Sequence, residues 1–463
     1  MNYYRYFSIM FFTLIFLSVY GQENKVEKLR NLLNEGRYFE SKELYDEIHQ
    51  TLDFDEALSY KYRMFSFMDQ KDSVAHCLEE LLEYYPEYIG NQAINVYVEL
   101  FNLYFLLGDN EKGMYTYKRL IEHLEDNPYD IAEKDIEECR NYVEKRLVYY
   151  KKLMSYPPIK LKRKAIDQPL DIIGEDKFRF DANFNGIKHK TIFDTGVECN
   201  CVMNLHYAEK MGIKCDASKI VYETINNEQM PSYEIIMDSI EIGNILLYNV
   251  PIQLVDNDIT QYLPDSIKTD SIKMAKVDSV KNMMSVPIIG LPVMQMIGKF
   301  MIDYENNKLY FPDLHDTSEM TKEPNLFFRN NKVYTQAKIN NVPFTGLLDT
   351  GSDGAIDIDT VFYEKFKNDI PIDTIAEKSP YNFVMIHCAW VDIPYEIPEL
   401  TTITLNNKCI LPPSENDDPL KIYSMQSIWP VEFLDGVLGY DFFKRIGKKV
   451  LLDLDNKRLE AVE

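Results

Sequence analysis

Apolar positions divide the chain into two stretches with different periods. From Glu23 to about Tyr156, apolar residues recur at three- and four-residue spacing and glycine is rare, which is the pattern of amphipathic helices. Pro157 and Pro158 end this pattern, and beyond them shorter apolar runs alternate with polar turns, as in β-structure. The sequence therefore predicts an all-α domain over residues 22–156, followed by an all-β region.

Three helix pairs and a final helix are expected in the helical stretch. Two segments share one spacing of small and aromatic residues, and they are separated by about two units of a repeat of about 34 residues. The matched residues are Gly36, Ser41 and Tyr45 in the first segment and Gly108, Gly113 and Tyr117 in the second. The middle pair is expected over residues 60–68 and 73–85, and the final helix over residues 131–154.

The segment from Phe101 to Tyr117 resembles a tetratricopeptide repeat. The resemblance implies a helical-repeat domain, and such stacks commonly present a groove to a peptide or protein partner. The alternative is that this domain only packs against the rest of the chain or acts as a spacer. Its apolar stripes are interior packing in either case.

The β region opens with two hairpins. Strands are expected over residues 177–183 and 189–193, on either side of the turn Asn185-Gly186. A second hairpin is expected from residues 220–225 and 233–242. Before them, the basic run at residues 160–164 is interpreted as a solvated linker.

One pattern occurs twice in the β region, at residues 192–197 and 347–352. In each copy an apolar pair runs into Asp-Thr-Gly, which predicts a buried strand that ends in a carboxylate and a sharp turn. Aligned on the two aspartates, residues 178–194 match residues 333–349 without gaps. Each copy is followed later by an apolar-apolar-Gly strand, ending at Gly290 and Gly439. The sequence therefore contains an internal duplication with one aspartate in each copy.

In type and order, these elements resemble the pepsin and retropepsin clan of aspartic proteases, in a single-chain form with two lobes. The resemblance covers about residues 165–463 and implies an all-β acid protease fold, with lobe 1 at residues 165–313 and lobe 2 at residues 326–463. It also implies that Asp194 and Asp349 form a catalytic dyad. Two carboxyl groups held this close share one proton and can activate a water molecule for attack on a peptide bond.

The same resemblance assigns supporting roles to the two loops. Thr195 and Thr350 are expected to hydrogen-bond across the dyad, while Gly196 and Gly351 let backbone N–H groups approach the carboxylates. Ser352 can donate a hydrogen bond to Asp349, whereas Val197, its equivalent in the first copy, cannot. This asymmetry predicts that the two aspartates titrate unequally, with Asp349 the more readily ionised.

The hairpin at residues 220–242 is expected to fold over the cleft as a flap, with residues 381–391 as its counterpart in lobe 2. Residues 257–285 are polar and longer than a β-domain connection needs, so a helix, a lid or a loop is expected there. The linker between the lobes is expected at residues 315–325.

Composition excludes several classes of function. The formal net charge of −24 argues against a nucleic-acid partner, because phosphates would be repelled. The seven histidines show no close metal-ligand spacing, and no phosphate-binding or dinucleotide motif is present, so neither a metal nor a cofactor is expected. The seven cysteines are too few for a disulfide scaffold. Cys199 and Cys201 are interpreted as core residues, although a bridge from either to Cys215 remains open.

Residues 1–21 have the pattern of a signal peptide. Arg5 supplies the positive start, residues 7–19 form an apolar run, and small residues precede Gln22. The run is too short for a comfortable membrane span, and no cysteine is present for a bacterial-type lipid anchor. The mature protein is therefore expected to be exported, periplasmic or secreted, with no stable membrane span.

The sequence thus favours an exported aspartic endopeptidase that acts on peptide or protein substrates. Two alternatives remain. In the first, the protease-like region binds peptides without cleaving them, because Val197 and the divergent loops mark a loss of activity. In the second, the helical domain is an assembly platform and carries the function.

Overall fold

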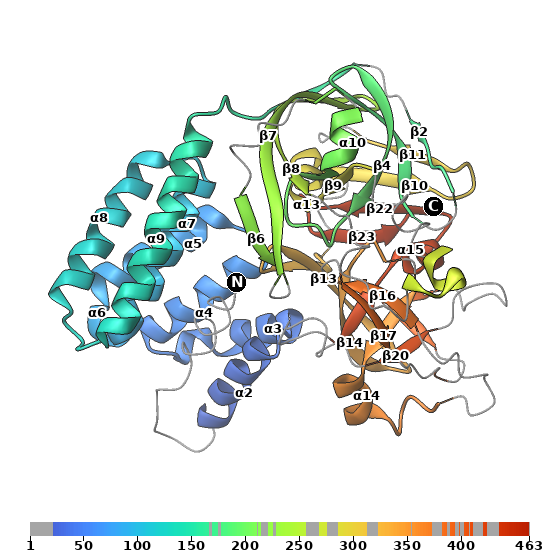
Figure 1. Cartoon of the computed structure of the whole chain (residues 1–463). Coiled ribbons are helices and arrows are strands. Elements are labelled where there is room, and N and C mark those ends of the chain that lie inside the picture. The colour runs from blue at the N-terminus through green and yellow to red at the C-terminus, as the bar shows by residue number, and fades with distance from the viewer. Residues whose placement is uncertain are drawn as a thin grey trace. The chain divides into compact units, whose positions relative to one another are not determined.

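The chain forms two compact units, Met1–Pro157 and Pro158–Glu463, each described here by itself (Figure 1). The computed structural model describes residues 22–165, 169–174, 177–210, 212–213, 221–225, 228–255, 268–275, 286–312, 323–352, 354–372, 382–386, 389–393, 398, 402–406, 408–410, 420–423 and 435–462.

The N-terminal unit is helical, as predicted. Its α-helices are α2 (Gln22–Asn34), α3 (Tyr38–Ile48), α4 (Phe54–Phe67), α5 (Lys71–Tyr84), α6 (Pro86–Ile89), α7 (Ala93–Leu106), α8 (Asn110–Asp126) and α9 (Glu133–Met154). Short 3-10 turns lie at His49–Thr51 and Gly90–Gln92. The helices pack in sequential pairs, α2 with α3, α4 with α5 and α7 with α8. The predicted middle pair corresponds to α4 and α5, and the predicted final helix to α9.

The turn between α7 and α8 explains why its glycines are needed. Gly108 ends α7 with a φ of 78°, which favours glycine. The Asp109 side chain then caps α8 by accepting a hydrogen bond from the Lys112 N–H at 3.0 Å. A Cβ atom on Gly113 would lie 2.7 Å from the Phe105 ring, so α8 crosses α7 closely at this point. The sequence GDNEKG therefore encodes a tight pair of helices.

The first half of the C-terminal unit is built on a curved sheet. Its strands are β1 (Lys160–Arg163), β3 (Arg179–Phe184), β4 (Ile187–Asp194), β5 (Cys201–Asn204), β6 (Val221–Ile225), β7 (Glu228–Ile242), β8 (Ile245–Val255) and β9 (Ile288–Gly290), with helices α10 (Leu205–Lys210) and α13 (Leu291–Ile297). The strand order is β1-β8-β5-β9-β4-β3-β7-β6, and an additional pairing of β7 with β8 closes the middle strands into a ring.

The second half repeats the same connections. Its strands are β12 (Leu326–Arg329), β13 (Lys332–Ile339), β14 (Val342–Leu348), β15 (Ile356–Asp359), β16 (Asn382–Ile386), β17 (Ala389–Ile393), β18 (Ile403–Leu405), β19 (Lys408–Cys409), β20 (Lys421–Tyr423) and β21 (Gly436–Leu438), with helices α14 (Thr360–Phe366) and α15 (Tyr440–Ile446). In both halves a hairpin (β3–β4 or β13–β14) pairs in parallel with a later short strand (β9 or β21).

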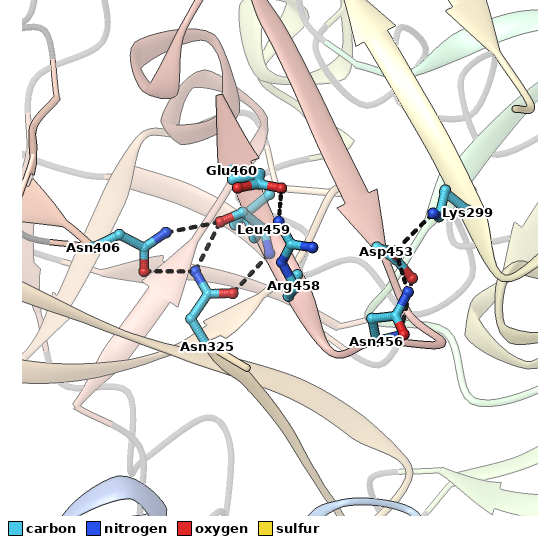
Figure 2. Close-up of polar contacts among 8 residues, drawn as sticks. All are labelled: Lys299, Asn325, Asn406, Asp453, Asn456, Arg458, Leu459 and Glu460. Carbon is cyan, nitrogen blue, oxygen red and sulfur yellow. Dashed lines mark hydrogen bonds and ion pairs between the residues drawn. The ribbon is translucent and has the colours of Figure 1, made fainter. Parts of the chain in front are cut away.

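A third sheet joins the two halves. It contains β2 (Leu170–Asp171), β10 (Lys299–Asp303), β11 (Lys308–Tyr310), β22 (Lys449–Asp453) and β23 (Arg458–Ala461), in the order β2-β11-β10-β22-β23. At its centre β10 pairs antiparallel with β22, so that Lys299 lies opposite Asp453. Figure 2 shows the ion pair between them, 3.1 Å long and almost fully buried.

The turns after β10 and β22 are stabilised by the same pair of hydrogen bonds between an aspartate and an asparagine. Asp453 accepts hydrogen bonds from the backbone N–H and side-chain amide of Asn456, at 2.9 and 2.8 Å (Figure 2). Asp303 binds Asn306 in the same way, at 3.0 and 2.9 Å. Because both strands lie in one sheet and one hydrophobic core runs through both halves, the halves are held in fixed relation to each other.

The start of the second half is tied to the last strand of this sheet. The Asn325 side chain donates to the Leu459 carbonyl and accepts from the Leu459 N–H, both at 2.7 Å (Figure 2). Asn406 also donates to the Leu459 carbonyl, at 3.1 Å. The chain therefore enters the second half at a position fixed by its own C-terminal strand.

Several local predictions can be compared with the structure. The hairpin around Asn185-Gly186 is confirmed. The second predicted hairpin is only partly right, because β6 pairs with Glu228–Ser232 at the start of β7, while residues 233–242, the expected partner, pair with β8. The prediction of a solvated linker at residues 160–164 is wrong, because residues 160–163 form β1, which pairs with β8. Arg163 also donates to the Ile297 carbonyl at 2.5 Å, so this edge strand is held by tertiary contacts that a charge pattern does not reveal.

Other predictions lie outside the described residues. These are the signal peptide at residues 1–21, the bridge to Cys215 and most of the segments at residues 257–285 and 315–325. Cys201 lies in the hydrophobic core. Among the described helices, none combines the length and apolar character required to cross a membrane.

Candidate active site

The two Asp-Thr-Gly loops meet between the halves of the C-terminal unit. Each loop follows a buried strand, β4 for Asp194 and β14 for Asp349. Each strand is flanked by a parallel partner from its own half, since Phe193 pairs with Ile289 and Leu348 with Leu438. The central position of these strands fixes the direction in which the two loops leave the sheets.

Threonine side chains cross-link the loops in both directions. The Thr195 hydroxyl donates to the Leu348 carbonyl at 2.6 Å and accepts from the Thr350 N–H at 3.1 Å. In return, the Thr350 hydroxyl donates to the Phe193 carbonyl at 2.9 Å and accepts from the Thr195 N–H at 3.0 Å. Both threonines are at most 1% exposed, so the four hydrogen bonds are shielded from water. They fix the separation of the loops.

The glycines place the two carboxyl groups face to face. Asp194 accepts a hydrogen bond from the Gly196 N–H at 2.8 Å, and Asp349 accepts one from the Gly351 N–H at 2.9 Å. A Cβ atom on Gly351 would lie 2.2 Å from Oδ2 of Asp194, and one on Gly196 would lie 3.0 Å from Oδ1 of Asp349. Each glycine therefore makes room for the carboxylate of the opposite loop.

The surroundings of Asp194 favour its protonated form. Burial raises the pKa of Asp194 most, followed by the negative charge of Asp349 and a side-chain hydrogen bond with it. The Gly196 N–H and the positive charge of Lys177 act in the opposite direction, but the pKa of Asp194 remains well above its ordinary value. Asp194 therefore keeps a proton at pH values at which an exposed aspartate is ionised.

Ser352 does not have the contact expected of it. In the described part of the chain, no hydrogen bond joins its hydroxyl to Asp349; its backbone N–H donates to the Asp349 carbonyl at 3.0 Å instead. The Ser352 carbonyl accepts from the Tyr440 N–H at 2.8 Å, just as the Val197 carbonyl accepts from the Leu291 N–H at 2.9 Å. Both positions thus make these hydrogen bonds through their backbones.

The apolar-apolar-Gly strands have a steric role that the pattern alone did not explain. A Cβ atom on Gly290 would lie 2.1 Å from the Cys199 carbonyl oxygen, and one on Gly439 would lie 2.2 Å from the Gly354 carbonyl oxygen. In each half this strand passes directly beneath the loop that carries the aspartate. A larger residue at either glycine would push the loop outward.

Lys177 was missed by the sequence analysis. It lies two residues before β3, is 6% exposed, and donates from Nζ to the Gly351 carbonyl at 2.6 Å. The sequence does contain a signal, because extending the alignment of the two copies by one residue places Lys177 over Lys332.

The predicted flaps are seen only as backbone pairings. β6 pairs with β7 from Val221 opposite Ser232 to Ile225 opposite Glu228, and β16 pairs with β17 in the second half. Their role as covers over the two aspartates stays a prediction. Over the described ranges, no three His, Cys, Asp or Glu side chains are grouped so that they could hold a metal ion.

One of three comparisons with known proteins bears on the type of domain. Residues 180–280, which include Asp194, match the model of a family described as aspartyl protease. No curated protein matches the chain. Among solved structures, the chain is similar to a retropepsin-like aspartic protease from Rickettsia conorii, at 17% sequence identity and a TM-score of 0.21, over 33% of this chain and 90% of that one. The family match supports an aspartic protease domain in the C-terminal unit.

Proposed function

We propose that the C-terminal unit is an aspartic endopeptidase with two lobes and that Asp194 and Asp349 form its catalytic dyad. The observation that carries this proposal is the cross-linked pair of loops. Four buried hydrogen bonds between Thr195, Thr350 and the strands before them hold one carboxyl group from each half against the other. A merely structural aspartate does not require a second loop built to face it.

The raised pKa of Asp194 assigns a role to each carboxyl group. Asp194, with its raised pKa, holds the shared proton and donates a hydrogen bond to the peptide carbonyl, which makes the carbonyl carbon more electrophilic. Because the pair shares one proton, Asp349 is the partner that accepts a proton from the attacking water. The water oxygen bonds to the carbonyl carbon, and the amine leaves after a proton is returned to it. No covalent bond forms between enzyme and substrate.

The loop residues support this reaction without entering it. The Gly196 and Gly351 N–H groups each bind the aspartate of their own loop, so the carboxyl oxygens that remain available are directed toward the substrate. The threonines keep the two groups at the separation at which one proton is shared. We propose that the β6–β7 hairpin covers the bound peptide as a flap.

We further infer that the protein is exported after removal of residues 1–21, and that the helical unit is a tetratricopeptide-like domain that recruits a peptide or protein partner. The first inference is supported by the charge and apolar run of the N-terminus. The second is supported by the sequential pairing of the helices and by the close α7–α8 crossing at Gly113.

The test is cleavage of a diverse peptide library by the purified full-length protein at several pH values. The wild type is compared with Asp349→Asn and with a matched control, Asp181→Asn. Asp181 lies on β3 in the same half as Asp194, but its partner is the exposed Lys188, 2.7 Å away. We expect cleavage by the wild type and the control and none by Asp349→Asn. If the wild type binds peptides and cleaves none, the protein is a binding module.

A further inference from the structure

Lys177 brings a positive charge from one half of the C-terminal unit to the catalytic loop of the other. It lies before β3 in the first half, and its Nζ donates to the carbonyl of Gly351 in the second half, at 2.6 Å. With only 6% of its surface exposed, it lies in an environment where an ammonium group is costly unless it has polar partners. A buried lysine at this position therefore needs polar partners, and the Gly351 carbonyl is one of them.

The backbone at this position is fixed by packing between the halves. Phe178, the next residue, is 1% exposed, and its ring lies at 4.7 Å from Tyr440 and 5.5 Å from Phe443, measured between ring centroids. Both of these residues belong to α15, which directly follows the apolar-apolar-Gly strand of the second half. The start of β3 is thus anchored in the second half, and Lys177 is delivered to Gly351 by a rigid segment.

The charge of Lys177 reaches the dyad. The charged groups that act most strongly on Asp194 are Asp349 and Lys177, with opposite signs. A dyad of two buried carboxyl groups must keep one negative charge in order to activate water, and a nearby cation favours the charged form.

The equivalent lysine of the second half is arranged differently. Lys332 is the first residue of β13, whereas Lys177 lies two residues before β3, and Lys332 too reaches the opposite half, at Glu198. Its Nζ, however, lies 3.6 Å from Oε1 of Glu198, and the two side chains are 21% and 52% exposed. An ion pair this exposed to water contributes little to stability. Lys332 therefore serves as a matched control for Lys177.

We propose that Lys177 is a positioning residue of the dyad, which holds the second catalytic loop through the Gly351 carbonyl and keeps a buried positive charge beside the two aspartates. This inference rests on the proposed function. It assigns to Lys177 no contact with the substrate.

The test compares Lys177→Gln, Lys177→Arg and Lys332→Gln in the full-length protein. The glutamine amide can still donate to the Gly351 carbonyl but carries no charge, whereas arginine keeps the charge. We expect Lys177→Gln to lower kcat about tenfold with KM within about threefold, because the loop and its charge are disturbed after substrate has bound. Its whole pH profile should move upward by about one pH unit, since the dyad holds its protons more tightly without the cation.

Lys177→Arg should restore kcat to within about threefold of the wild type, and Lys332→Gln should leave the profile in place. A Lys177→Gln variant that loses thermal stability while its kcat and pH profile stay unchanged would show a purely structural role and overturn the proposal. An equal shift in Lys332→Gln would also overturn it. If Lys177→Gln does not fold, Lys177→Met takes its place, and equal profiles for the methionine and arginine variants count against the proposal.

A second readout separates this inference from the proposed function. The carboxyl groups of Asp194 and Asp349 are titrated by NMR in protein labelled with 13C-aspartate, which needs no substrate. Absence of cleavage by the wild type would refute the proposed peptidase, while the titration would still decide the role of Lys177. The inference predicts titration at higher pH in Lys177→Gln, and an unchanged titration contradicts it.

Discussion

The two halves of the C-terminal unit carry the same Asp-Thr-Gly loop but surround it differently. The threonine contacts match in both directions, with distances of 2.6 to 3.1 Å. The lysines do not match, since Lys177 is buried against the Gly351 carbonyl while Lys332 meets the exposed Glu198. The shared features are those that set the distance between the aspartates. The features that differ are the lysine contacts, so the two loops have different charged neighbours although their sequences match.

Among substitutions that leave both aspartates in place, the largest effect is expected from Gly351→Ala. Its new methyl group would lie 2.2 Å from Oδ2 of Asp194, whereas the equivalent group in Gly196→Ala would lie 3.0 Å from Oδ1 of Asp349. We therefore expect kcat to fall about a hundredfold or more in Gly351→Ala and about tenfold in Gly196→Ala. Steady-state kinetics on one peptide measures both. Equal losses of kcat in the two variants would contradict the difference between these two distances.

The threonines should instead give equal effects. Thr195→Val and Thr350→Val each remove one hydroxyl that makes two buried hydrogen bonds. We expect either substitution to lower the free energy of unfolding by about 2 to 4 kcal/mol, because a carbonyl and an N–H are left unsatisfied. Denaturant unfolding measures the change. A difference of more than about 1 kcal/mol between the two would mean that the loops are not tied symmetrically.

The pH dependence of stability should report the raised pKa of Asp194. In the folded protein this group keeps its proton above its ordinary pKa of 3.8, while in the unfolded chain it ionises. The folded state then binds more protons, so this group's contribution to stability falls as pH rises from about 4 toward the raised pKa, by at most about 1.4 kcal/mol per pH unit. Asp194→Asn should remove this slope, which unfolding measurements at several pH values would detect. A slope that persists in Asp194→Asn would assign it to other groups.

The smallest effect is expected from Ser352→Ala. The sequence predicted a hydrogen bond from this hydroxyl to Asp349, but Ser352 contacts the loop through its backbone N–H. We therefore expect kcat within about threefold of the wild type and an unchanged pH profile, since no side-chain hydrogen bond to Asp349 is lost. A shift of the acidic limb of the pH profile in Ser352→Ala would instead support the predicted hydrogen bond from the Ser352 hydroxyl to Asp349.

Local patterns predicted those parts of the molecule that depend on short stretches of chain. The Asn185-Gly186 turn defines a hairpin because glycine and asparagine adopt positive φ there, 81° and 50°. Gly351 was predicted from the Asp-Thr-Gly pattern, although the structure requires it for the close approach of the Asp194 carboxyl group and not for a positive φ. The helices of the N-terminal unit follow from apolar periodicity alone.

Features that depend on packing between the halves were not predicted. In the sequence, Lys177 is one charged residue at the start of a hairpin. Its position follows from the packing of Phe178 against α15, which the sequence does not reveal. The basic run at residues 160–163 becomes strand β1 because β8, far along the chain, offers it an edge. The central pairing of β10 with β22 joins residues that no local pattern relates. In each case the deciding contact lies far away in the sequence.

The central claim is that the two halves form one catalytic site, and the most direct measurement compares kcat/KM for Asp194→Asn, Asp349→Asn and the double variant. If both aspartates act on one water and share one proton, each single substitution should abolish cleavage as completely as the double one. Circular dichroism would verify that all three variants fold. Substantial cleavage by either single variant, or losses that add in the double variant, would contradict the account.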